Sequence, residues 1–193
     1  MTVLDGAEGW AYAVSGRVRG TALDDLSGEA VARTLPSLLR ALDAAARVDL
    51  AGTSGYGIWT PDGRAPHASW PEALLAIGTE TPRVPGWRAA LVDSGIGLGP
   101  VEAGLSALAA LTPCLPDARR LIHGDLLTHW RATGPTPAHL RERLHAYLLH
   151  IALDALAYCA YRSRWDEVRA HVGTVLTLAS ADGGESVLIP AGA

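Results

Sequence analysis

The sequence contains no lysine, asparagine, glutamine or phenylalanine among its 193 residues. Every side chain that is cationic at neutral pH is therefore an arginine, apart from any protonated histidine. The missing lysine excludes a lysine that holds a phosphate or forms a Schiff base, and the missing amides exclude carboxamide metal ligands. Codons for lysine, asparagine and phenylalanine are AT-rich, so the bias indicates a GC-rich genome, such as that of an actinomycete.

The charge balance and the cysteine content exclude several classes of protein. A net charge of −4 and a pI of about 5.9 argue against nucleic acid or anionic lipid as the main partner. Cys114 and Cys159 lie outside any CxxC or Cys/His ligand pattern. The N-terminus lacks a signal-peptide pattern, and no apolar run reaches about 18 residues. We therefore expect no membrane span, a cytoplasmic location, and neither a metal nor a cofactor.

Hydrophobic periodicity predicts a mostly α fold with a small β remnant. Alternating residues predict a short strand over 10–18, alone or in a hairpin, and an apolar run predicts another over 119–122. Spacings of three and four predict helices over 29–48, 69–77, 87–94, 101–111, 138–161 and 165–178. Ser27 and Thr136 are predicted N-caps, and Pro36 predicts a kink or a later helix start. We expect one domain over 1–180, then a flexible tail over 181–193.

Four stretches, taken in order, carry a resemblance to a known family. Residues 12–20 read YAVSGRVRG, residues 49–57 lead to Trp70 at a helix start, residues 121–125 read LIHGD, and residues 140–156 form a late helix. Their order and spacing resemble the hygromycin and aminoglycoside phosphotransferases, a kinase-like family. The resemblance implies the helical C-lobe of that fold, preceded by the strand that links the two lobes.

The departures from that family concern the groups that hold ATP and magnesium. Kinases of this kind need a Gly-rich loop and a lysine before the linking strand, and only about ten residues precede that strand here. The catalytic loop should place an asparagine five residues after Asp125, where this chain has Trp130. Residues 134–137 then lead directly into the late helix, without the strand pair that carries the second magnesium ligand. The resemblance therefore implies a pseudokinase that retains a fold and a substrate pocket.

The loop over 121–125 suggests candidate catalytic residues. Asp125 lies where the family keeps its catalytic base, and it could accept a proton from a bound hydroxyl or ammonium group. The competing interpretation is a loop carboxylate that caps a turn. His123 is expected to support the loop, and His129 to contact substrate. A metal site formed by these three residues has no fixed ligand spacing to favour it.

Two further groups of residues are candidates for substrate binding. In the insert, aromatic and acidic side chains would suit a cationic amine: Tyr56, Trp70, Glu72 and Glu80. On the late helix, polar residues recur every four positions and share one face: His150, Asp154, Tyr158 and Arg162. This face either lines a pocket or is solvated surface. The competing interpretation of the abundant tryptophan is codon bias and core filling.

These observations favour a non-phosphorylating enzyme, or an enzyme subunit, in the biosynthesis of a specialised metabolite such as an antibiotic. Asp125 would assist displacement, cyclisation or elimination on an amine-bearing substrate. One alternative is a non-catalytic protein that binds an antibiotic or intermediate for self-resistance, and another is a phosphotransferase completed by a partner chain. Because 49% of residues are hydrophobic and one lobe is missing, we also expect a partner protein or a homo-oligomer.

Overall fold

The computed structural model describes residues 2–5, 11–14, 20–21, 25–81, 83–115 and 138–180. The chain divides into two compact units, Met1–Asp43 and Ala44–Ala193. The sequence prediction of one domain over 1–180 stays a prediction, and the predicted tail over 181–193 lies outside the described residues. The strand predicted over 119–122 and the cap predicted at Thr136 also lie outside them.

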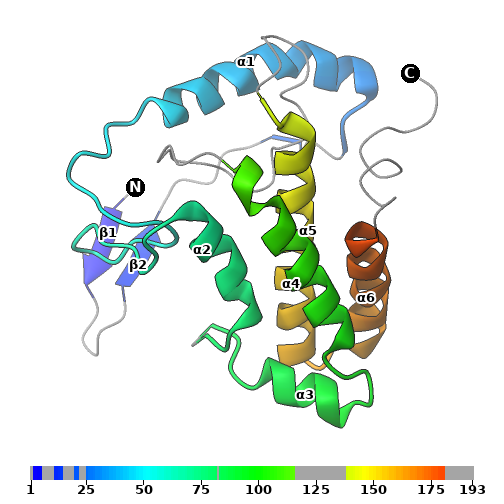
Figure 1. The fold of residues 1–193 in the computed structure, drawn as a ribbon. Helices are drawn as coiled ribbons and strands as arrows, with labels where there is room; N and C mark the ends of the chain where they lie inside the picture. Colours follow the sequence, from blue (N-terminus) through cyan, green and yellow to red (C-terminus); the bar gives the residue numbers. More distant parts are fainter. Residues whose placement is uncertain are drawn as a thin grey trace. The chain divides into compact units, whose positions relative to one another are not determined.

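The first unit contains a hairpin and a long helix. Strands β1 (Thr2–Asp5) and β2 (Ala11–Val14) pair antiparallel (Figure 1). Helix α1 (Gly28–Ala46) starts where Ser27 Oγ accepts a hydrogen bond from the backbone N–H of Ala30 at 3.3 Å. This contact confirms the predicted N-cap. The helix continues through Pro36.

The second unit is built from the predicted helices, which confirms the mostly α fold. Its elements are α2 (Trp70–Leu75), η2 (Ala76–Gly78), α3 (Trp87–Asp93), α4 (Gly99–Leu111), η3 (Thr112–Cys114), α5 (Leu140–Tyr161) and α6 (Trp165–Ala179). Their ends lie within about two residues of the predicted ends, as expected for positions where helices fray. None of the helices in the described part of the chain is both long and apolar enough to cross a bilayer.

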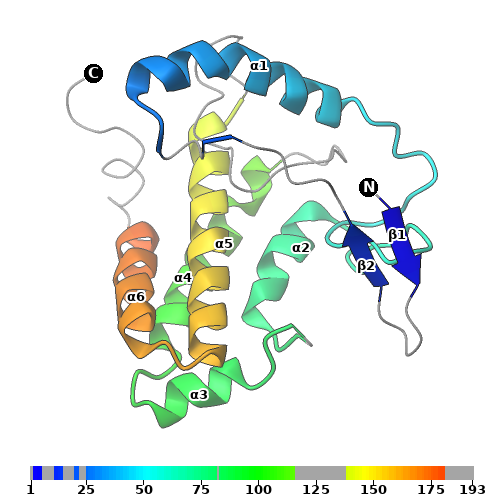
Figure 2. The ribbon, with the colours of Figure 1, turned by 180° about the vertical axis from the view of Figure 1, so that it is seen from behind.

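Helix α5 is the centre of the second unit. It packs against α3, α4 and α6, and it contacts η2 (Figures 1 and 2). Its fully buried positions include Leu149, Leu156 and four alanines, so neighbouring helices can approach closely. Helix α6 returns antiparallel beside α5, and His145 Nε2 lies 2.7 Å from the Leu178 carbonyl oxygen at the far end of this pair. The resulting core holds α5 as a fixed support for α2 and η2.

Candidate functional site

The insert between α1 and α2 is ordered by backbone contacts rather than by helices. Two isolated bridges join Ser54 to Arg64 and Tyr56 to His67. Between them Gly55 has a φ of 73°, and a Cβ there would lie 2.3 Å from the Ala65 carbonyl oxygen. Only glycine fits such a position without moving the backbone. This close crossing places Tyr56 next to the start of α2.

Trp70, the first residue of α2, lies between two tyrosines. Its ring centroid is 6.5 Å from that of Tyr56 and 6.1 Å from that of Tyr147, both tilted arrangements that aromatic pairs favour. The indole Nε1 donates a hydrogen bond to Tyr147 Oη at 2.9 Å. Burial raises the pKa of Tyr147, partly offset by this hydrogen bond and by the charge of Arg143. The phenol therefore stays neutral, and it fixes the orientation of the indole.

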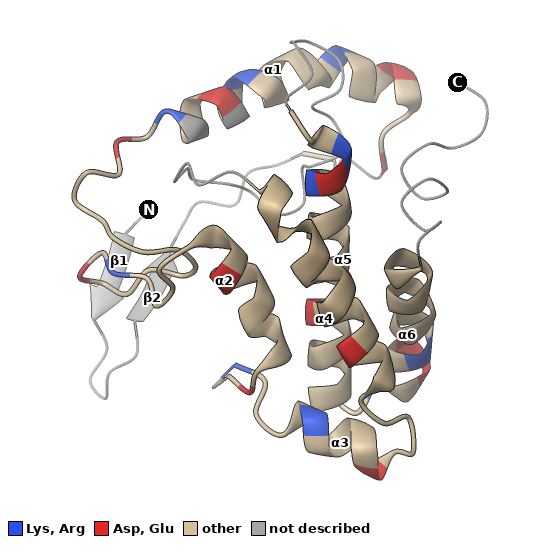
Figure 3. Ribbon diagram, in the orientation of Figure 1, with Lys and Arg blue, Asp and Glu red and all other residues tan. Residues whose placement is uncertain are grey.

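Glu72 lies in the first turn of α2, and both oxygens of its carboxylate have contacts. One oxygen accepts a hydrogen bond from the backbone N–H of Ala68 at 2.9 Å, and the other lies 3.6 Å from His67 Nδ1. Ser69 Oγ in turn accepts from the Glu72 N–H at 3.2 Å. This arrangement is close to a capping box, and the sequence Ser-Trp-Pro-Glu carries the signature of one. Glu72 is the only charged residue of α2, and its side chain remains 53% exposed (Figure 3).

These residues are linked by contacts from one to the next, and we call the group the aromatic–acidic patch. Its members are Tyr56, His67, Trp70, Glu72 and Tyr147. The structure therefore brings together three of the residues predicted from the insert, namely Tyr56, Trp70 and Glu72. Tyr147 and His67 were not predicted as site residues. Tyr147 follows Trp70 by 77 positions, so no local pattern could have paired them.

The other acidic residue predicted in the insert, Glu80, has a different environment. Its two carboxylate oxygens accept hydrogen bonds from the backbone N–H groups of Gly86 and Arg88, at 2.6 and 3.2 Å. Glu80 thus satisfies donors at the start of α3, which otherwise have no partner within the helix. Its predicted role in substrate binding stays a prediction, and we leave it out of the patch.

On the polar face of α5, two of the four residues contact neighbouring segments and the other two are exposed to solvent. His150 Nδ1 lies 2.9 Å from the Leu74 carbonyl oxygen, and Asp154 lies 3.5 Å from Arg83 Nη2. Because a carbonyl oxygen only accepts, His150 Nδ1 must carry the proton. Tyr158 and Arg162, by contrast, are exposed. The first half of the predicted face therefore holds α2 and the turn after it, whereas the second half faces water.

The remaining site predictions cannot be placed. Asp125, His123 and His129 lie outside the described residues, so their geometry and their roles stay predictions. Among the residues that the structure does describe, no cluster of three or more His, Cys, Asp or Glu side chains could hold a metal ion.

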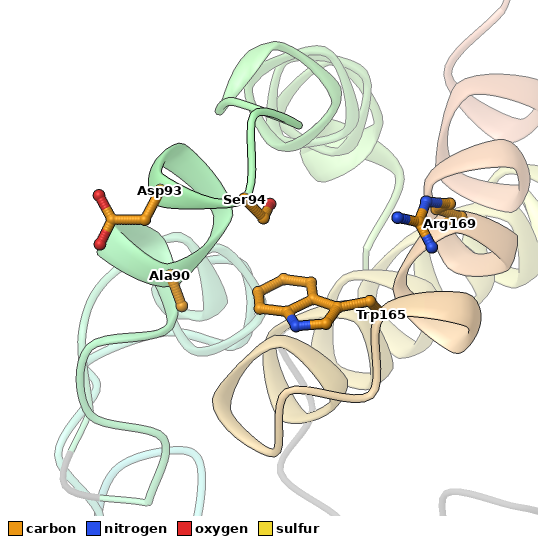
Figure 4. Close-up of a pocket in the computed structure, with 5 residues that line it drawn as sticks. All are labelled: Ala90, Asp93, Ser94, Trp165 and Arg169. Carbon is orange, nitrogen blue, oxygen red and sulfur yellow. The ribbon is translucent and has the colours of Figure 1, made fainter.

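A hollow of about 490 Å³ lies apart from the patch, between α3 and α6 (Figure 4). The Trp165 indole forms its floor, and Ser94 and Arg169 face one another across it, whereas the Asp93 carboxylate points away. Arg169 Nη1 lies 3.0 Å from Asp166 Oδ1, and Ser94 Oγ donates to the Leu91 carbonyl at 2.8 Å. The two polar groups that face this hollow are therefore already paired.

Comparison with known proteins shows what the chain is similar to. No protein-family profile matches the chain. Over 119 residues, however, it is 30% identical to hygromycin-B 4-O-kinase from Escherichia coli, an alignment that covers 62% of this chain and 34% of that protein. Over this stretch the chain is therefore similar to an aminoglycoside phosphotransferase. It spans about a third of the length of that curated relative.

Solved structures of aminoglycoside phosphotransferase APH(4)-Ia share the fold. A thermostable mutant in ternary complex with AMP-PNP and hygromycin B matches with a TM-score of 0.71 and 23% identity, over 96% of this chain and 77% of that one. The apo form of a thermostable mutant matches with a TM-score of 0.70 and 23% identity, over 96% and 78%. These likenesses confirm the predicted fold, the helical lobe of the aminoglycoside phosphotransferases. They establish the fold alone.

Proposed function

We propose that this aminoglycoside phosphotransferase-like chain binds an amine-bearing, polyhydroxylated small molecule at the aromatic–acidic patch. The observation that carries the proposal is the Trp70 indole, held between two tyrosines, with the half-exposed carboxylate of Glu72 two residues later on the same helix. Aromatic faces attract cations and the apolar faces of sugar rings, and a carboxylate makes charge-assisted hydrogen bonds to ammonium groups. The presence of hygromycin B in a structure that shares this fold supports the same class of ligand.

Replacing Glu72 with glutamine is expected to weaken binding of hygromycin B, used as the probe, by roughly tenfold. A hydrogen bond to a charged group contributes about 1.5–3 kcal/mol, and the exposure of Glu72 reduces its effect toward the lower limit. Glutamine keeps an oxygen that can accept from the Ala68 N–H, so the cap should survive. Isothermal titration calorimetry at low ionic strength measures the change.

The matched control is Glu102→Gln, which removes one exposed carboxylate from α4, away from the patch. Its affinity should equal that of the wild type. Equal affinities for Glu72→Gln and wild type, or no heat of binding for either protein up to millimolar ligand, would remove the patch as the binding site.

Chemistry at the bound ligand is the further part of the proposal. Asp125 would act as the general base, supported by His123, in a displacement, cyclisation or elimination that needs no phosphate donor. Mass spectrometry of an amine-bearing ligand after incubation separates this role from simple binding. If the chain is an enzyme, the mass of the ligand changes, and Asp125→Ala abolishes that change without altering the affinity for the ligand. A binding protein returns the ligand unchanged with either chain.

A phosphotransferase completed by another chain is the second candidate. It is favoured by the nucleotides AMP-PNP and ADP bound in structures that share the fold. The phosphate-binding lysine would have to come from outside these 193 residues, because none of them is a lysine, and this candidate assigns it to the partner. In that case the ligand gains a phosphoryl group only when ATP, magnesium and the partner are all present.

A further inference from the structure

Three polar contacts fasten α2 and the turn after it to α5. Trp70 Nε1 donates to Tyr147 Oη at 2.9 Å, His150 Nδ1 donates to the Leu74 carbonyl oxygen at 2.9 Å, and Arg83 Nη2 lies 3.5 Å from Asp154 Oδ2. The three α5 residues are separated by three and four positions, so they share one face of that helix. Both ends of α2 therefore contact the same face of α5.

The three ties differ in how they respond to pH. The Trp70–Tyr147 hydrogen bond joins two groups that are neutral near pH 7. The side chains of Arg83 and Asp154 are 61% and 32% exposed, so solvent screens their pair. An imidazole, in contrast, changes charge between about pH 5 and pH 8. Of the three contacts, the one that His150 makes is therefore the one that mild acidification can change.

The surroundings of His150 decide the direction of that response. On α5 its charged neighbour is Asp154, which is shared with Arg83 of the following turn. Helix α2 offers only Glu72, which faces His67, and α4 offers only Glu102, which is exposed. On α3, Arg88 donates to the Gly78 carbonyl, and Asp93 is exposed. A protonated ring at this position would thus have the Leu74 carbonyl oxygen and one carboxylate, which Arg83 partly compensates.

Burial lowers the pKa of His150, an effect that the hydrogen bond to Leu74 and the charge of Asp154 reduce without reversing. The docked state therefore binds fewer protons than an undocked state, in which the ring has its ordinary pKa of about 6.5. Docking keeps its full stability above about pH 6.5, and it loses stability as the pH falls below that value.

We propose that His150 makes the docking of α2 on α5 dependent on pH, so that the aromatic–acidic patch is fully assembled only while this histidine is neutral. Acidification would loosen α2, separate Trp70 from Tyr147 and lower the affinity for the amine-bearing ligand. The effect on affinity rests on the proposed function, whereas the loosening of α2 does not.

Hydrogen exchange, measured by mass spectrometry on peptides that cover residues 69–79, tests the proposal without any ligand. After correction for the intrinsic pH dependence of exchange, protection in the wild type should fall by as much as about tenfold between pH 7.5 and pH 5.5. One proton taken up on undocking allows no larger change over this interval. His150→Asn retains a donor near the position of Nδ1 but cannot titrate, so its protection should stay constant.

The matched control is His145→Gln, because His145 also contacts a backbone carbonyl, but between α5 and α6. This variant should keep the wild-type pH dependence in residues 69–79. The proposal is overturned if wild-type protection is independent of pH, or if His150→Asn follows the wild-type curve. Should that variant fail to fold, the ¹H–¹⁵N indole resonance of Trp70 in the wild type decides: a shift with a midpoint at or below about pH 6.5 supports the proposal. An unmoved resonance contradicts it.

Discussion

Replacing Trp87 with alanine is expected to lower the free energy of unfolding by about 3–5 kcal/mol. Trp87 is the first residue of α3 and is only 1% exposed, so its side chain fills the core between α3 and α5. The Arg88 guanidinium carbon lies 5.4 Å from the centroid of its ring, which adds a cation–π contact. Urea unfolding followed by far-UV circular dichroism measures the loss.

Phenylalanine at position 87 should be far less harmful than alanine. The indole Nε1 of Trp87 is buried and has no hydrogen-bond partner among the residues that the structure describes, which is an unfavourable state for a polar group. Phenylalanine removes that donor and keeps most of the apolar volume, so we expect a loss below about 1.5 kcal/mol. A loss as large as that of the alanine variant would show that the N–H has a partner after all.

Replacing Gly104 with valine is expected to destabilise the protein by about 1–3 kcal/mol through overpacking. Gly104 is buried in α4 where that helix meets α5 and α6. A Cβ at this position would lie 2.7 Å from Val175 Cγ1 and 3.1 Å from Leu153 Cδ2. The β-branched valine adds two further methyl groups, so the three helices would have to separate.

Gly173 offers the matched control within the same bundle. It lies on the exposed face of α6, and a Cβ there would meet nothing within 4 Å. Gly173→Ala should therefore raise the free energy of unfolding by about 0.5–1 kcal/mol, because alanine favours the helix and restricts the unfolded chain. Thermal unfolding of both variants should shift in opposite directions, and shifts of the same sign would contradict the packing argument.

The sequence was sufficient to predict the helices of the second unit. Apolar residues at spacings of three and four determine which face of a helix is buried, and this pattern is local. Helix starts were equally local, as the hydrogen bond from Ala30 to Ser27 shows. The capping of α2 by Glu72 was also present in the sequence, as a serine followed three residues later by glutamate, but we interpreted this carboxylate only as a ligand group.

What faces each helix could not be predicted in this way. The spacing on α5 indicated one polar face correctly, but it could not show that His150 contacts the Leu74 carbonyl, 76 positions earlier. Tyr147 was missed for the same reason, because its partner Trp70 belongs to a different helix. Such contacts depend on how helices pack together, which a single sequence does not reveal.

The separation of these contacts along the chain also has a consequence for folding. Helices α5 and α6 are joined by a turn of three residues, whereas the ties between α2 and α5 close loops of more than 70 residues. Each doubling of loop length adds about 0.6 kcal/mol of entropic cost, and non-local contacts slow folding. The α5–α6 hairpin should therefore form early and α2 dock late. The aromatic–acidic patch would then be complete only after α2 has docked. The ligand would therefore bind only to chains that have finished folding.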